Sequence, residues 1–76
     1  MSEKNNLWKK GGSHYQNFKI QPSKFINENK LQFAEGNVIK YICRHTKKDR
    51  AEDIKKAIHY CEMILERDYD WSNDDN

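Results

Sequence analysis

Cysteine and glycine are scarce in this sequence, and each shortage excludes a class of protein. The two cysteines, Cys43 and Cys61, are too few for the disulfide framework of a small secreted domain, so the sequence indicates a reducing compartment. The three glycines form no Gly-rich nucleotide loop, and the pattern G-x-x-x-x-G-K-[ST] does not occur. A kinase of the Walker type is therefore excluded.

Long apolar runs are also missing. No run approaches the ~20 residues that span a membrane, and residues 1–10 lack the apolar segment of a signal peptide. The mean hydropathy is -1.19, and charged residues make up 34% of the chain. We therefore expect neither secretion nor membrane insertion, and we expect a cytoplasmic protein.

The length of 76 residues allows one domain. A chain this short buries only about 60% of the surface that its unfolded form exposes, so its core is thin. Because there are too few cysteines for a disulfide framework, self-association is the expected source of further stability. The sequence therefore predicts a homo-oligomer.

Charge is distributed unevenly, although the formal net charge is only +2. Residues 1–50 carry 11 Lys and Arg against 4 Asp and Glu, whereas residues 51–76 carry 3 against 8. Such a division is typical of a contact between subunits, of a basic surface for an anionic ligand, or of an ordinary solvated surface. Composition alone leaves these three interpretations open.

The N-terminal part of the chain is polar. Residues 1–13 end in Gly-Gly-Ser and are interpreted as a flexible leader. Residues 14–69 form the single predicted helical domain, and its first part, residues 14–21, is predicted to be ordered and extended. Pro22 suits the first position of a helix because its missing N–H has no helical partner there. A short helix is predicted from Pro22 to about Asn29.

Two longer helices are predicted after it. The first runs from about Gln32 to His45 and the second from about Arg50 to Tyr69, and residues 70–76 form an acidic, frayed tail. The predicted fold class is therefore all-α. It consists of an extended N-terminal segment, one short helix and a long antiparallel helix pair, assembled as an oligomer.

The last helix has the clearest pattern. Asp49, with Glu52 three residues later, is an Asp variant of the capping box. The apolar positions recur at helical spacing and are expected to be buried, namely Ile54, Ala57, Ile58, Cys61, Ile64 and Leu65. We therefore expect Ile58→Ala to cost ~2–5 kcal/mol of stability. This apolar face also has room for a partner helix.

A polar stripe on the preceding helix is the first candidate site. At about 100° per residue, Asn37, Lys40 and Arg44 fall together. Gly36 borders them, where the lack of a side chain lets a ligand or another backbone come close. Glu35 falls toward the apolar side, where its carboxylate needs a Lys or Arg partner. The opposite, apolar face contains Ala34, Val38, Tyr41 and Ile42.

A basic connection follows this stripe. Residues 44–50 read Arg-His-Thr-Lys-Lys-Asp-Arg and lead into a helix N-terminus, whose free N–H groups attract anions. Lys47 and Lys48 therefore join Lys40 and Arg44 as candidate phosphate ligands. The alternative interpretation is a solvated connection between two helices.

Cysteine and histidine are the candidate metal-binding and acid-base residues. Cys43-x-His45 and His59-x-Cys61 cannot chelate one ion, because residues two apart on a helix point about 160° away from each other. The sequence therefore predicts no metal site. His14 follows two glycines closely and could contact a ligand or act as an acid or base. No complete catalytic constellation is visible.

Four motifs occur together and resemble one family. They are HYQ at 14–16, I-x-P-x-x-F-I at 20–26, EGNVIKYICRHTKKD at 35–49 and EDIKKAIHY at 52–60. The sequence is similar to the SaV-like family, a small domain of unknown function found in early proteins of tailed phages and often labelled phage nucleotide kinase. The resemblance covers about residues 13–66. It implies a phage protein in the cytoplasm of the infected bacterial host.

The resemblance also implies a shared set of polar residues. The set is His14, Tyr15, Gly36, Asn37, Lys40, Arg44, Asp53, Lys56 and Tyr60. In the interpretation that we favour, Lys40 and Arg44 contact phosphate. Residues 36–37 line the pocket and residues 14–15 close over it, with the tyrosine stacking on a base.

Three functions follow as expectations. Some members of the resembled family are credited with phosphorylating nucleoside monophosphates, but no catalytic constellation is visible here. We therefore expect non-catalytic sequestration of a nucleotide or cyclic-nucleotide signal of host immunity, without a cofactor. The alternative is an oligomeric nucleoside monophosphate kinase without a Walker motif, with His14 or Asp53 for proton transfer. The third is binding of nucleic acid or a host protein, which the basic half and Trp8 favour.

Overall fold

A computed structural model describes residue 15 and residues 17–71. Within these residues the chain forms three α-helices and one short 3-10 helix, and no strand. The predicted all-α class is confirmed. No helix in this part of the chain is long and apolar enough to cross a membrane. The leader at residues 1–13, His14 and the tail beyond Trp71 lie outside the described residues.

The helices agree with the predicted ones to within one residue at each end. They are α2 (Pro22–Glu28), α3 (Phe33–Arg44) and α4 (Ala51–Tyr69), with the 3-10 helix η2 (His45–Lys47) between the last two. Proline begins α2 as expected, because the first turn of a helix does not need its N–H.

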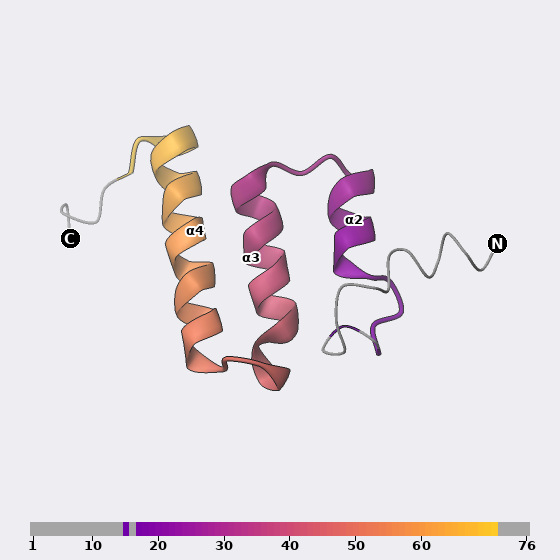
Figure 1. Ribbon diagram of the computed structural model, residues 1–76. Coiled ribbons are helices and arrows are strands. Elements are labelled where there is room, and N and C mark those ends of the chain that lie inside the picture. Colours follow the sequence, from indigo (N-terminus) through magenta and orange to yellow (C-terminus); the bar gives the residue numbers. More distant parts are fainter. Residues whose placement is uncertain (1–14, 16, 72–76) are drawn as a thin grey trace.

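The three helices lie side by side in one layer, with α3 between α2 and α4 (Figure 1). α3 and α4 run in opposite directions and are joined by η2 and a turn (Figure 1). The molecule measures 14 Å along its shortest axis, close to the ~10–12 Å diameter of a single helix. Both broad faces of this layer are therefore open to contact.

Small residues make the contacts between the helices. Ala34 and Gly36 on α3 and Ala57 on α4 are buried. A Cβ added at Gly36 would lie 3.1 Å from Cγ2 of Ile26 on α2. The glycine therefore lets the Ile26 side chain of α2 pack closely against α3, whereas the approach predicted at this position was that of a ligand or another backbone.

The expected burial of the larger apolar residues is wrong at several positions. Ile58 is 53% exposed, Ile42 is 47% exposed, and Cys61 is exposed. Among the described residues the buried apolar side chains are those of Pro22, Ala34 and Ala57. A single layer explains this, because each helix is covered only along the sides that contact its neighbours.

The predicted capping box does not form at the start of α4. Arg50 is the N-cap residue, with φ at 50°, and no side chain caps the helix there. Instead, the Asp49 backbone N–H donates to Oδ2 of Asp53 at 3.1 Å. Asp53, rather than the predicted Glu52, therefore makes the hydrogen bond to the backbone before the helix. The turn after η2 places the Asp49 N–H beside the Asp53 carboxylate.

The segment before α2 is a turn at its described residues, which corrects the prediction of an extended chain. The Phe18 N–H donates to the Tyr15 carbonyl at 3.3 Å, and residues 19–20 bend. The buried Gln21 side chain donates to the same carbonyl at 2.8 Å. These two hydrogen bonds satisfy the Tyr15 carbonyl. They also join the turn to the start of α2.

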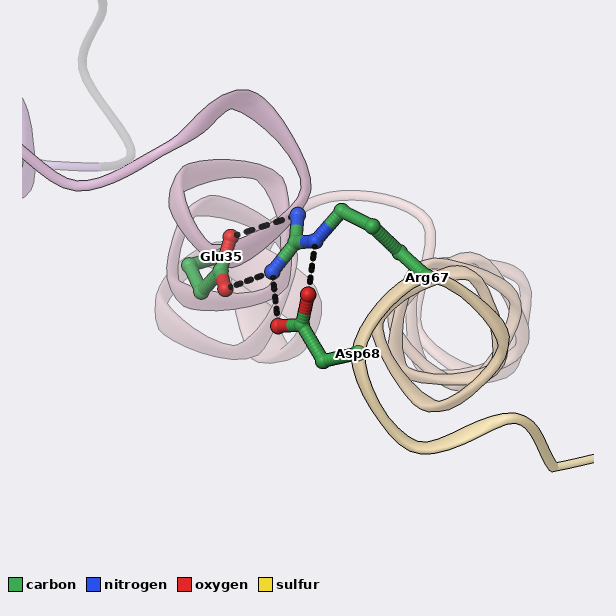
Figure 2. A network of polar contacts seen from close by, with 3 residues as sticks. All are labelled: Glu35, Arg67 and Asp68. Carbon is green, nitrogen blue, oxygen red and sulfur yellow. Dashed lines mark hydrogen bonds and ion pairs between the residues drawn. The ribbon is translucent and has the colours of Figure 1, made fainter.

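The far end of the helix pair is joined by an ion cluster. Arg67 of α4 donates to both carboxylate oxygens of Glu35 on α3 and to those of its neighbour Asp68 (Figure 2). These hydrogen bonds hold the pKa of Glu35 and of Asp68 below the ordinary carboxyl value. The expectation that Glu35 needs a basic partner is confirmed.

Candidate functional site

A cleft of about 260 Å³ lies between α2 and α3. Three of the predicted site residues line it, Gly36, Asn37 and Lys40. The floor and rim also contain the apolar Ile26, Leu31 and Phe33 and the polar Ser23, Asn27 and Gln32. The volume is slightly below the ~300–1,000 Å³ typical of small-molecule sites. The cleft therefore suits one flat group, with the rest of a ligand outside it.

Polar groups and an aromatic ring stand at the edges of this cleft. The Asn37 amide N–H donates to the Phe33 carbonyl at 3.0 Å, and an asparagine side chain has a second N–H and a carbonyl oxygen as well. The Phe33 residue is 74% exposed, and its ring contacts that of Tyr60 on α4 edge to face, with centroids 5.8 Å apart. The cleft thus combines hydrogen-bonding capacity with a surface for stacking.

Three cations surround one tyrosine ring beside the cleft. The ring centroid of Tyr41 lies 5.2 Å from Nζ of Lys40, 4.7 Å from Cζ of Arg44 and 5.4 Å from Nζ of Lys56. Each distance is within the ~6 Å range of cation–π attraction. Tyr41 also stacks on Tyr60 of α4, with centroids 5.9 Å apart and planes 13° apart. The structure therefore brings residues of α3 and α4 together at one basic surface.

Arg44 is already paired within the chain. Its Nε and Nη2 donate to the two carboxylate oxygens of Asp53, at 3.2 and 3.1 Å. Asp53 is 0% exposed, so its charge is removed from water and is balanced by this bidentate partner. The hydrogen bonds from Arg44 hold the pKa of Asp53 below its ordinary value of 3.8. Direct ligand binding by these two residues stays a prediction. Their hydrogen bonds join α3 to α4, so the pair has a structural role.

The carboxylate of Asp53 also occupies the place where the sequence predicted an anion. It lies in the first turn of α4 and accepts the Asp49 N–H, beside the positive end of the helix dipole. Lys47 and Lys48, the other residues predicted near this point, are exposed on η2 and the following turn. They lie outside the lining of the cleft.

Tyr15 lies beside Arg44 at the other side of the site. Burial raises the pKa of the Tyr15 hydroxyl above 10.0, while the charge and a hydrogen bond of Arg44 act in the opposite direction. Its ring contacts that of Phe18 edge to face, with centroids 6.4 Å apart. Its predicted partner in closing the pocket, His14, lies outside the described residues.

Two groups of site residues were missed by the sequence analysis. One is the α2 side of the cleft, Ser23 and Asn27, which are four residues apart and so share a helix face with Ile26 beside it. The other is the role of Tyr41, which was placed on an apolar face. A signal for it existed, since Lys40 and Arg44 flank it within one turn.

The described residues do not group three His, Cys, Asp or Glu side chains in a way that could hold a metal ion. The cleft and the basic surface are therefore described by their amide, aromatic and ammonium groups alone. Such groups recognise flat rings and anions.

A family model described as a protein of unknown function, DUF3310, matches residues 9–62, which is 54 of the 76 residues. The chain belongs to the DUF3310 family. The DUF3310 match includes the whole of α2 and α3 and the part of α4 that contains Asp53, Lys56 and Tyr60. The cleft and the basic surface thus lie inside the DUF3310 region.

A search of curated proteins and a search of solved structures each found no match for this DUF3310 chain. The description of the DUF3310 family assigns no activity. What the protein does is therefore argued from the geometry of the site.

Proposed function

We propose that this DUF3310 protein binds a phosphorylated nucleotide without transforming it. In this proposal the base enters the cleft between α2 and α3, and the phosphate lies between Lys40 and Lys56. The observation that carries the proposal is the position of Lys40, which lines the cleft and also lies against the Tyr41 ring that Lys56 contacts from α4. One side chain thus connects a site for a flat group to a site for an anion.

The charge balance supports an anionic ligand. Arg44 is opposed by Asp53 and by Asp49, whose Oδ2 lies 3.7 Å from Nη2. Lys40 and Lys56 form no ion pair with any residue in the described part of the chain. Two ammonium groups without a protein carboxylate attract a phosphate, which carries about -1.5 to -2 charges at pH 7 as a monoester.

The shape of the cleft supports a nucleobase. Exposed aromatic rings stack on bases with about 1–3 kcal/mol per base, and Phe33 offers such a ring at the rim. Asn37 and Asn27 supply amide groups of the kind that bond the edges of bases. The close approach of α2 at Gly36 sets the width of the cleft.

The state of Asp53 favours sequestration over the kinase alternative. A proton-transfer residue must come within hydrogen-bond reach of the substrate. The Asp53 carboxylate is fully buried and both of its oxygens accept hydrogen bonds from the protein. Proton transfer would therefore fall to His14, the other candidate of the kinase interpretation.

The biological setting belongs to the same proposal. The resemblance of the motifs at 14–16, 20–26, 35–49 and 52–60 to early phage proteins supports a role in the cytoplasm of an infected bacterium. A small protein that holds nucleotides there would lower the concentration of a nucleotide or cyclic-nucleotide signal of host immunity. The experiments below use both kinds of nucleotide, because the cleft accepts a base of either.

Calorimetry on the full chain tests the binding site. Nucleoside 5′-monophosphates and cyclic dinucleotides are titrated into wild type, Lys40→Ala, Lys56→Ala and the control Lys24→Ala, whose lysine pairs with the exposed Glu28 instead. A hydrogen bond to a charged group contributes ~1.5–3 kcal/mol, so each site variant should weaken binding about 10- to 150-fold. Equal affinity in all four proteins would place the site elsewhere.

Turnover is tested separately. Wild type is incubated with a nucleoside monophosphate, ATP and Mg²⁺, and the nucleotides are separated by chromatography. Recovery of unchanged monophosphate after denaturation supports sequestration. Formation of diphosphate by wild type and its loss in His14→Gln would favour the kinase, because general acid-base help contributes ~100- to 10,000-fold to a rate. Binding to any nucleic acid with steep salt dependence would favour the third function.

A further inference from the structure

An apolar stripe runs along the side of α4 that stays exposed. It consists of Ile54, Ile58, Cys61 and Leu65, and Tyr69 extends it. Ile58, Cys61 and Tyr69 are exposed, and the other two are half-buried. At about 100° per residue all five fall within an arc of about 80°. The stripe is therefore continuous along the helix, and three of its five residues are open to solvent.

The spacing of the stripe is symmetric about a point between Cys61 and Glu62. Ile58 and Leu65 are equally far from this point along the sequence, and so are Ile54 and Tyr69. If two copies of α4 pack in opposite directions around a two-fold axis through this point, Ile58 lies opposite Leu65 of the second copy. A two-fold axis brings a surface against itself, so only a stripe with this kind of symmetry matches its own copy.

Charges beside the stripe fit the same arrangement. Lys55 and Glu66 lie on one flank of the stripe, and the two-fold axis brings that flank against its own copy. Lys55 then falls about 3 Å along the axis from Glu66 of the second copy, at a rise of 1.5 Å per residue. The symmetry repeats this pair, so two attractive contacts border the apolar stripe.

We propose that this stripe is the interface of a homodimer in which α4 packs against α4 of a second copy. The inference goes beyond nucleotide binding and does not depend on it. The thin layer needs such a contact, since the buried apolar side chains of its described part are one proline and two alanines. The dimer adds a second layer of helix where the first leaves apolar residues uncovered.

Sedimentation equilibrium on the full chain tests the interface. Wild type at tens of micromolar should have about twice the monomer mass of 9.2 kDa. Ile58→Lys should weaken dimerisation by at least about 100-fold, because the two-fold axis places each new ammonium group against the apolar Leu65 of the other copy, where it has no partner charge. The matched control is Met63→Lys on the same helix, 41% exposed and about 170° around α4 from the stripe. It should remain a dimer.

Loss of helix content in Ile58→Lys would be a different effect, so circular dichroism accompanies the measurement. Monomeric wild type, or an Ile58→Lys protein that stays dimeric with its helices intact, would overturn the proposal. In the first case the stripe would contact another part of the chain or a different protein.

Oxidation of Cys61 gives an independent test of the register. The two-fold axis places Cys61 only about 1.5 Å along the helix axis from its own copy, so the two thiols lie at nearly the same height in the proposed interface. Diamide oxidises two thiols to one disulfide and takes up the two hydrogens. A covalent dimer should form in Cys43→Ser and be absent in Cys61→Ser and in Ile58→Lys. A covalent dimer that requires Cys43 instead would contradict this register.

The proposed two-fold axis also predicts that a substitution at Glu62 strengthens the dimer. It lies beside the axis and therefore near Glu62 of the second copy, where two like charges repel. Glu62→Gln should tighten the dimer about 1.5- to 2-fold, in line with the small energies of like-charged pairs on helices. Unchanged or weaker dimerisation would contradict the placement of the axis.

Discussion

Lys40 and Arg44 lie one turn apart on α3, and their surroundings give them different tasks. Arg44 donates two hydrogen bonds to a carboxylate that is shielded from water. Lys40 forms no ion pair within the described part of the chain and lies at the cleft. Removing Arg44 leaves the buried Asp53 carboxylate with the Asp49 N–H but without an opposite charge, whereas removing Lys40 leaves no buried charge.

Arg44→Ala should therefore act on stability before it acts on binding. Breaking a buried ion pair by removing one partner costs about 3–5 kcal/mol, which is a large part of the stability of a small domain. Urea unfolding should show this loss, while Lys40→Ala unfolds within about 0.5 kcal/mol of wild type. Arg44→Lys should recover only part of the loss, since an ammonium group cannot form the two-pronged contact. Equal midpoints for Arg44→Ala and wild type would show that the pair contributes nothing.

The Asp53 carboxyl should make the fold sensitive to acid. Its pKa is lower in the folded chain than the ordinary 3.8, chiefly because of the hydrogen bonds from Arg44. Its contribution to stability is therefore fully present above about pH 4 and is lost as the pH falls through the lower, folded pKa. Carboxyl ¹³C chemical shifts should show Asp53 titrating below the ordinary aspartate pKa of 3.8. A normal Asp53 titration would contradict the pairing with Arg44.

At the scale of helices, the contact between α2 and α3 depends on the size of one residue. A Cβ at Gly36 would approach Ile26 Cγ2 to 3.1 Å, so a branched side chain fits only if the Ile26 side chain or α2 itself shifts. Gly36→Val should therefore cost about 1–3 kcal/mol by overpacking and should also weaken nucleotide binding.

The double variant Gly36→Val with Ile26→Ala provides the matched control, because it removes the obstructing methyl group. The stability effects of residues in contact differ from additivity by about 0.5–3 kcal/mol. The double variant should therefore be more stable than the sum of the two separate losses predicts. Strict additivity in urea unfolding would show that the two side chains do not meet.

The helices were predictable and their capping was not, for a physical reason. The helix ends follow from local signals such as Pro22 and the apolar period, which act within one turn. The start of α4 instead depends on Arg50 at a φ of 50° and on Asp53 binding both Asp49 and Arg44. Arg44 comes from another helix, so no local pattern contains that arrangement.

For the same reason, only part of the candidate site could be predicted from the sequence. The stripe of Asn37 and Lys40 lies on one helix, so helical angles alone placed both beside Gly36, and all three line the cleft. The α2 side of the cleft and the meeting of Lys56 with Tyr41 depend on packing between helices. Helical angles said nothing about which residues of different helices would meet.

At the scale of the whole molecule, Ile58 connects stability to concentration. The earlier expectation of ~2–5 kcal/mol for Ile58→Ala assumed a buried side chain, but this residue is half exposed in one chain. In dilute solution the loss should fall below about 1 kcal/mol. At higher concentration it should grow, because a dimer stabilises its folded subunits by mass action.

Thermal unfolding at 1 and 100 µM checks this prediction. Ile64, half-buried on the same helix and outside the stripe, provides the control. The shift in melting temperature caused by Ile64→Ala should be the same at both concentrations. A melting-temperature shift for Ile58→Ala that does not change with concentration would show that this residue takes no part in dimerisation.

The two surfaces of the molecule have separate positions on α4. Lys56 lies about 170° around the helix from the apolar stripe, so a dimer formed through the stripe leaves both basic surfaces facing outward. Each dimer would then present two nucleotide sites. Loss of dimerisation in Ile58→Lys should accordingly leave the affinity of each site unchanged.

The 14 Å thickness of the layer also determines which substitutions the protein tolerates. A protein with a deep core rejects polar side chains at many positions. This layer instead rejects large side chains at a few positions. Ala34, Gly36 and Ala57 lie where helices touch, and there any larger residue, polar or apolar, forces two helices apart. Along the broad faces, side chains of almost any volume fit. A saturation scan of the described residues should therefore sort substitutions by volume at those three positions and by chemistry elsewhere.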